Sequence, residues 1–183
     1  MREVAEETKV IDCAEKHNVK VLVFGCPQNR KVLSLDAEND LIFVEFFKKI
    51  GKYLKDKNVV ICIENNSKQY NCNYINNINE CSNIVHQIDN DNIKMMVDLG
   101  NAVMEDDAWY NIKNDMNIIY NIDISNPNMD SFDNMHESNK EFNSVLRSSK
   151  YHNILNLEFL IKDKDELSVL HHSLTNFIHI YCD

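Results

Sequence analysis

The sequence predicts an α/β fold built on a parallel sheet, and two observations carry this prediction. Short apolar runs alternate along the whole chain with longer segments of helical periodicity. The short runs are apolar almost without interruption, which is typical of parallel strands covered on both faces. The 183 residues suffice for one domain with a real core, and no linker-like segment divides them. We therefore expect a single domain over residues 1–183.

The predicted elements follow one another in the order helix, strand, helix. Asn77 begins a helix with Glu80 as its capping-box partner, and Asp163 begins the last helix with Glu166 in the same role. The predicted helices cover residues 2–17, 38–55, 77–88, 102–115, 138–149 and 164–180. The predicted strands cover residues 20–25, 58–64, 93–98, 117–125 and 153–161.

Four acidic residues stand at or near the ends of four of these strands, one in each. They are Glu64, Asp98, Asp123 and Glu158. An acid is a poor choice for a buried strand unless something pairs with it. Four acids in corresponding places predict a ring of carboxylates at one end of the sheet, where α/β barrels carry their chemistry. In the alternative interpretation, the acids cap neighbouring helices or pair with lysines.

Composition limits the classes of function. The net charge of −10 disfavours nucleic-acid binding, and no apolar run is long enough to cross a membrane. The charged N-terminus predicts no signal peptide. The six cysteines form no Cys-x-x-Cys pair, so we expect reduced thiols in a cytoplasmic protein.

Several segments, in order along the chain, resemble the xylose isomerase-like TIM-barrel superfamily. This superfamily contains sugar isomerases and epimerases together with endonuclease IV-type AP endonucleases. The similar stretches are Val-Leu-Val-Phe-Gly-Cys-Pro-Gln-Asn-Arg (21–30), Ile-Glu-Asn-Asn-Ser-Lys-Gln-Tyr-Asn-Cys-Asn-Tyr (63–74), Met-Val-Asp-Leu-Gly-Asn (96–101), Ile-Asp-Ile-Ser-Asn-Pro (122–127) and Asn-Leu-Glu (156–158). The resemblance implies an incomplete barrel, corresponding to about strands four to eight of eight. Open sheet edges would then favour a homo-oligomer or pairing with a missing N-terminal portion.

The resemblance also implies a function and a set of site residues. Glu64 and Glu158 would be the base and acid of a sugar or sugar-phosphate isomerase or epimerase, moving a proton next to a carbonyl. The same two residues, with Asp98 and Asp123, would bind a divalent metal. Asp123 stands where the family commonly has a histidine, so the set is all oxygen and suits Mn²⁺ or Mg²⁺ better than Zn²⁺. Asn101 replaces a second histidine often found three residues after the aspartate. The three-metal site of the AP endonucleases lacks its histidines here.

Four further residues are candidates for contact with a sugar. Asn29 and Arg30 follow a turn at a strand end, and Asn65 follows Glu64. His136 lies in the polar stretch 126–137, which is either a substrate-covering loop or a surface excursion. Each of the four has a purely structural alternative. The competing hypothesis for the whole chain is a catalytically inactive partial barrel that acts as a binding or assembly partner.

Overall fold

The computed structural model describes residues 2–34, 37–107, 109–132, 137–162 and 165–182. Its five strands are β1 (Val21–Phe24), β2 (Val60–Glu64), β3 (Ile93–Asp98), β4 (Ile119–Ile124) and β5 (Ile154–Leu157). The α-helices are α1 (Arg2–Lys16), α2 (Ala37–Leu54), α3 (Ile78–Ile88), α4 (Leu99–Met104), α5 (Glu137–Ser149) and α6 (Glu166–Tyr181). Short 3₁₀ turns cover Pro27–Asn29 (η1), Lys68–Tyr70 (η2), Trp109–Asn114 (η3) and Pro127–Met129 (η4).

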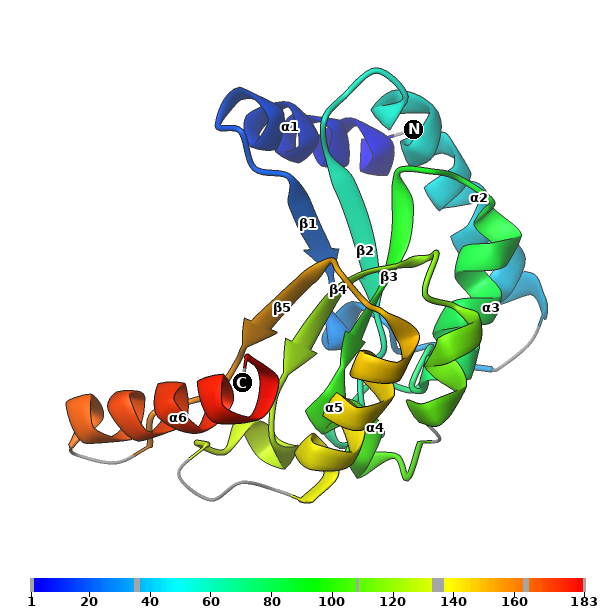
Figure 1. Ribbon diagram of the computed structural model, residues 1–183. Coiled ribbons are helices and arrows are strands. Elements are labelled where there is room, and N and C mark those ends of the chain that lie inside the picture. Colours follow the sequence, from blue (N-terminus) through cyan, green and yellow to red (C-terminus); the bar gives the residue numbers. More distant parts are fainter. Residues whose placement is uncertain (1, 35–36, 108, 133–136, 163–164, 183) are drawn as a thin grey trace.

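The strands form one parallel sheet in the order β1-β2-β3-β4-β5, so each strand pairs with its neighbour in the sequence. The sheet curls, and helices flank its outer side (Figure 1). Sequential parallel pairing with intervening helices is the pattern of a (β/α) barrel. The prediction of a barrel-type sheet with fewer than eight strands is confirmed.

The hydrophobic core lies between the outer face of the sheet and the helices. Because successive side chains of a strand point to opposite faces, alternate residues such as Ile61 and Ile63 of β2 enter this core. Phe47 of α2 and Ile84 of α3 meet them from the helices. The same buried cluster also contains Ile11, Ile50, Leu54, Ile78, Ile88, Val97, Ile122, Ile124, Phe132 and Phe142.

The inner face of the sheet is more polar than the interior of a barrel usually is. The residues that alternate with the core positions include Cys62, Lys94, Asn121 and Asn156, together with Met96. Barrel interiors are more often filled with branched aliphatic side chains. The polar inner face leads directly to the strand ends that carry the acids.

The structure differs from the predicted elements in two places. The helix expected over 102–115 is instead α4, which starts directly at the end of β3, followed by the separate turn η3. Asp98 causes the early start, since it caps α4 by accepting a hydrogen bond from the Asn101 N–H. Asp163 lies outside the described residues, and the cap that the structure shows for α6 is Asp165, whose side chain accepts from the Ser168 N–H. In the described ranges, no helix is long and apolar enough to span a membrane.

Candidate functional site

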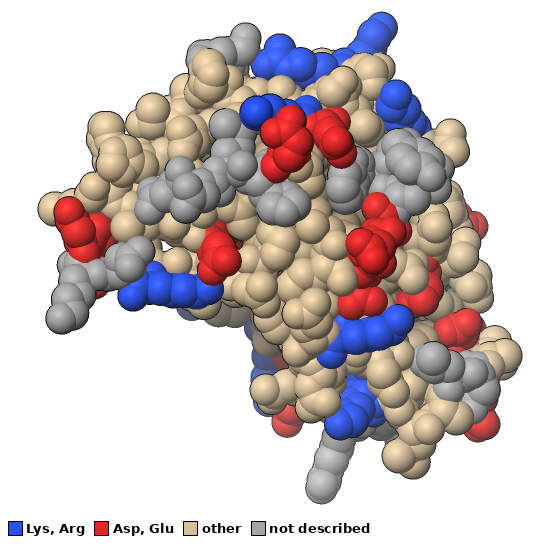
Figure 2. Space-filling view, turned by 90° about the horizontal axis from the view of Figure 1, so that it is seen from below, with Lys and Arg blue, Asp and Glu red and all other residues tan. Residues whose placement is uncertain are grey.

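The four strand-end acids lie at the same end of the sheet. Glu64 is the last residue of β2, and Asp98, the last residue of β3, is the register partner of Asp123 in β4. Glu158 directly follows β5, and its N–H donates to the carbonyl of Ile124 at 3.0 Å. Figure 2 views the molecule from this end, where acidic side chains, with some basic ones among them, are spread over the surface. The predicted position of the acids on one rim is what the sheet register produces.

Glu64 is held by contacts from the turn after β1. The guanidinium of Arg30 donates to the carbonyl of Glu64 at 2.7 Å and also contacts Asn66 Oδ1. Gly25 leaves room for the Glu64 carboxylate, because a Cβ at position 25 would stand 2.2 Å from Glu64 Oε2. The Asn101 amide donates to Glu64 Oε1 at 3.4 Å. The side chain of Glu64 is therefore confined between two neighbouring segments.

Asp98 serves both the fold and the rim. Its Oδ1 accepts from the N–H of Asn101 at 2.7 Å and from the hydroxyl of Ser125 at 2.9 Å. Its own N–H donates to Asn65 Oδ1 at 3.2 Å. The helix-capping alternative considered from the sequence thus applies to this one acid, while Asp98 also remains beside Asp123.

Asp123 is fixed by two amides of the inner face. Asn156 Nδ2 donates to Asp123 Oδ1 at 2.8 Å, and Asn121 Nδ2 donates to the same oxygen at 3.2 Å. Asn156 also donates to Asn121 Oδ1 at 3.0 Å, which ties the two amides to each other. Asp123 Oδ1 therefore accepts from both amides, and Asp123 Oδ2 accepts from neither.

Burial raises the pKa values of all four acids, and for Glu64, Asp98 and Glu158 the charges of neighbouring acids add to the rise. Burial, followed by the charge of Asp98, raises the pKa of Glu64 to about 8, although Arg30 opposes this. Burial, followed by the charges of Asp123 and Asp98, raises the pKa of Glu158 to about 7. The pKa of Asp98 is raised to about 6 by burial, and burial also raises that of Asp123. The contact between the carboxyl groups of Asp98 and Glu158 lowers the pKa of the first and raises that of the second.

The donor set matches a divalent cation in its chemistry. Four carboxylates supply the hard oxygen ligands that Mg²⁺ and Mn²⁺ prefer, and they lack the imidazole or thiolate that favours Zn²⁺. Across the part of the chain that the structure describes, no three His, Cys, Asp or Glu side chains are arranged to hold a metal ion. The chemistry of the donors therefore fits such a cation, and their spacing in this structure does not form its site.

The residues predicted to contact a sugar are dispersed. Asn29 is exposed on η1 and, with Arg30, lines a groove of about 590 Å³ between β1 and α2, which none of the four acids lines. Arg30 is buried and donates to main-chain carbonyls, as its structural alternative requires. Asn65 is buried beside Asp98, and its amide nitrogen has no hydrogen-bond partner among the described residues. His136 lies outside the described residues.

Sequence reasoning missed the amides that support the acids. Asn121 and Asn156 stand two residues before Asp123 and Glu158, a spacing that places both members of each pair on the same face of a strand. That spacing was a usable signal. Asn101 was noted only as the replacement of a histidine, and nothing in the sequence indicated that its amide reaches Glu64.

A comparison with protein-family models identifies the family. The model named xylose isomerase-like TIM barrel matches residues 2–172. The chain belongs to this family. No curated protein matches the sequence significantly.

Solved structures of low sequence identity share the fold. A D-psicose 3-epimerase determined in the presence of D-fructose has a TM-score of 0.84 at 14% identity, covering 99% of this chain and 71% of its own. The D-psicose 3-epimerase of Clostridium cellulolyticum H10, with D-tagatose, has a TM-score of 0.80 at 16% identity, with coverages of 97% and 70%. The IOLI protein with a bound zinc atom has a TM-score of 0.79 at 14% identity, with coverages of 97% and 68%. This chain spans 68% to 71% of the length of each of these three structures.

Proposed function

We propose that this family member is a sugar or sugar-phosphate isomerase or epimerase that moves a proton next to a carbonyl. The convergence of the four strand-end acids on one rim is the observation that carries the proposal. The similar solved structures include epimerases determined with ketose sugars, which supports the same class of substrate.

Glu64 and Glu158 are the proposed proton-transfer pair. A general base works best when its pKa lies near the working pH, and burial brings the pKa values of the two residues to about 8 and about 7. At neutral pH, one group of such a pair is largely protonated while the other is partly ionised. The ionised carboxylate can remove a proton from the carbon beside the carbonyl, and the protonated one can return a proton to the intermediate. The two glutamates stand at the end of β2 and directly after β5, on either side of Asp98 and Asp123 in the order of the strands.

Glu64, Asp98, Asp123 and Glu158 are also the proposed ligands of a divalent cation. When bound, such a cation supplies a positive charge that stabilises the negative charge developing on the sugar oxygens. The oxygen donors favour Mn²⁺ or Mg²⁺ as that cation. The chain's own contribution is to orient the acids, through Asn101, Asn121, Asn156 and Ser125.

Deuterium exchange tests the proposed reaction whichever sugar is formed. The protein is incubated in D₂O with Mn²⁺ and a panel of ketohexoses, pentuloses and their phosphates, and the C–H signals beside the carbonyl are followed by proton NMR. We expect deuterium to enter one position of at least one sugar. Glu64→Gln and Glu158→Gln should each abolish the exchange, while Glu141→Gln, on the exposed side of α5, should not. Exchange that persists in both site variants would contradict the assignment.

A second candidate function is a binding or assembly partner without catalysis, and the spacing of the acids favours it, since no three of the described side chains are arranged for a metal.

The sheet edges support self-association. Within the described residues, β1 and β5 each have one hydrogen-bonded neighbour, and Val23 and Ile154 on these strands are 45% and 40% exposed. We propose a homo-oligomer formed through these edges. Sedimentation velocity should show it, and Val23→Lys or Ile154→Lys should dissociate it; a monomeric wild type would contradict it.

A further inference from the structure

Asn101 lies between the two acids at the ends of β2 and β3. It is 4% exposed in the first turn of α4, and its N–H donates to Asp98 Oδ1 at 2.7 Å. Its side-chain oxygen accepts from the N–H of Ser67 at 3.0 Å, while its side-chain nitrogen donates to Glu64 Oε1 at 3.4 Å. One buried amide therefore connects α4 to the segment that follows β2.

The direction of this amide is determined by its partners. A main-chain N–H can only donate, so the atom of Asn101 that faces Ser67 must be the oxygen. The NH₂ group is consequently directed at Glu64. An Asn side chain that was free to flip could present either atom to the carboxylate, but the Ser67 N–H removes that choice.

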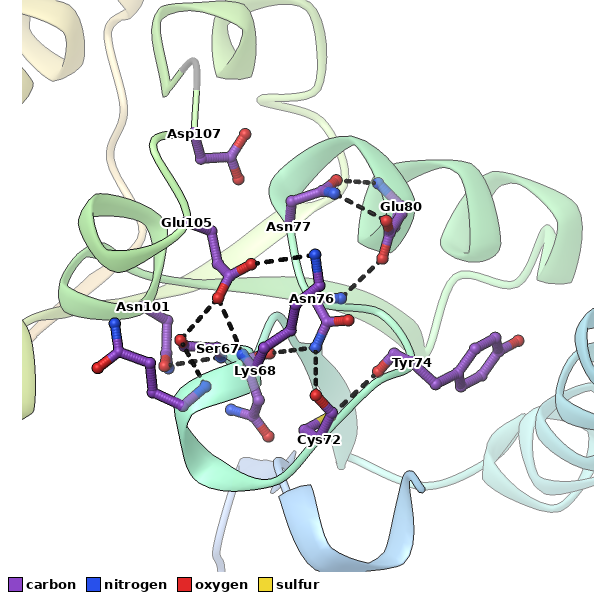
Figure 3. Close-up of polar contacts among 12 residues, drawn as sticks. Ser67, Lys68, Cys72, Tyr74, Asn76, Asn77, Glu80, Asn101, Glu105 and Asp107 are labelled. Carbon is purple, nitrogen blue, oxygen red and sulfur yellow. Dashed lines mark hydrogen bonds and ion pairs between the residues drawn. The ribbon is translucent and has the colours of Figure 1, made fainter. Parts of the chain in front are cut away.

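The loop that provides this N–H is itself clamped to the end of α4. Glu105 Oε1 accepts from the Ser67 hydroxyl at 2.8 Å and from the Lys68 N–H at 2.9 Å. Farther along, Asp107 Oδ2 accepts from the N–H of Ile78 at 2.6 Å. Figure 3 shows Glu105 extending from the end of α4 to Ser67 and Lys68, with Asn101 beside them. The residues after α4 thus hold both ends of the loop between β2 and α3.

We propose that Asn101 is a positioning residue for Glu64: its amide NH₂, oriented by the Ser67 N–H, fixes the orientation of the Glu64 carboxyl group for proton transfer. The donor satisfies Oε1, and Oε2 is the oxygen that packs against Gly25. This inference rests on the proposed role of Glu64 in proton transfer. The proposed positioning role of Asn101 is separate from metal binding and from helix capping.

Two substitutions of Asn101 separate positioning from a structural role. Asn101→Asp keeps an oxygen that accepts from the Ser67 N–H and removes the donor to Glu64, whereas Asn101→Ala removes both. Asn139→Asp is the matched control, because Asn139 is also buried and donates through Nδ2, to Asn126 Oδ1 in a different part of the fold. Hydrogen exchange of the Ser67 amide reports the loop contact, and the deuterium-exchange assay with sugar reports proton transfer.

We expect Asn101→Asp to retain slow exchange of the Ser67 amide while the rate at saturating sugar falls roughly tenfold or more, with KM little changed. Asn101→Ala should lose both the slow exchange of the Ser67 amide and the rate at saturating sugar. Asn139→Asp should change neither quantity. A wild-type rate in Asn101→Asp would overturn the proposal, because it would leave Asn101 with a structural role only. Rapid exchange of the Ser67 amide in Asn101→Asp would also overturn it, because the side chain at position 101 would then not be held by the Ser67 N–H.

A failure of the proposed function has a different signature. In that case the wild type exchanges no sugar proton, and the side-chain carboxyl carbon of Glu64, assigned by its disappearance in Glu64→Gln, becomes the readout. Asn101→Ala should move this ¹³C signal and Asn139→Ala should not, because only the first removes a contact with Glu64. An unmoved signal in Asn101→Ala would overturn the positioning role even then.

Discussion

Asp98 and Asp123 are register partners at the ends of β3 and β4, so two buried carboxyl groups stand side by side on neighbouring parallel strands. Adjacent strands lie about 4.8 Å apart, a separation at which two like charges repel appreciably in a poorly hydrated site. Donors from Asn101, Ser125, Asn121 and Asn156 offset part of this cost. The repulsion between these carboxylates thus destabilises the folded state, and the hydrogen bonds hold the carboxylates in place.

The first prediction concerns the pH dependence of stability in the presence of a chelator. Folding raises the pKa of Glu64 from 4.5 to about 8 and that of Asp98 from 3.8 to about 6. Between about pH 4 and pH 8, the folded protein therefore holds protons that the unfolded chain has released. The free energy of unfolding should fall as the pH rises through this window and level off above it, as urea titrations at several pH values would show.

The matched variant for this prediction is Glu64→Gln, which keeps the shape of the side chain and cannot ionise. Above pH 8, it should be more stable than the wild type by roughly 2–4 kcal/mol, and its dependence on pH should be flatter. Glu141→Gln, on the exposed part of α5, should reproduce the wild-type curve. A stability that increases from pH 5 to pH 8 would show that the carboxyl groups are not destabilising when ionised.

The second prediction is that a divalent cation stabilises the protein. A cation neutralises the repulsion among the four acids, so its binding to the folded state raises the unfolding free energy. At 100 times the dissociation constant, this gain is about 2.7 kcal/mol. Thermal unfolding with Mn²⁺ or Mg²⁺ should show an increase in Tm that disappears in Asp98→Asn and in Asp123→Asn. Equal shifts in all three proteins would place the cation elsewhere.

The third prediction concerns Gly25. An added methyl group would stand 2.2 Å from Glu64 Oε2, closer than any real Cβ contact, so Gly25→Ala must displace the carboxylate. Because the displaced atom is the end of a flexible side chain, we expect little change in stability together with a loss of cation binding in calorimetry. The neighbouring exposed residue provides the control, since Cys26→Ala should leave both unchanged. Normal cation binding by Gly25→Ala would mean that Glu64 is not a ligand.

The order of the strands and the position of the acids could be predicted from the sequence, because both depend on local patterns. Apolar runs define the strands, and parallel strands bring their carboxyl ends to one edge. The predicted start of α4 at residue 102 was wrong because the helix-capping alternative for Asp98, which places the start directly after it, was not used to set that boundary. The direction of the Asn101 amide could not be predicted, since it depends on a loop 34 residues away in sequence that folds back to supply the Ser67 N–H.

The last prediction concerns the amides that hold Asp123. Asn156 donates to Asp123 Oδ1 at 2.8 Å, and this hydrogen bond opposes the rise in the pKa of Asp123 that burial causes. Asn156→Ala should therefore raise the pKa of Asp123 further, as its side-chain carboxyl ¹³C signal would show in an NMR titration. Since a hydrogen bond to a charged group contributes about 1.5–3 kcal/mol, cation affinity should fall roughly tenfold or more. Asn153→Ala removes a comparable amide from the opposite end of β5, where it donates to the Ile119 carbonyl, and should leave the titration unchanged. If both variants titrate alike, Asp123 is held by the surrounding fold and not by its amide partners.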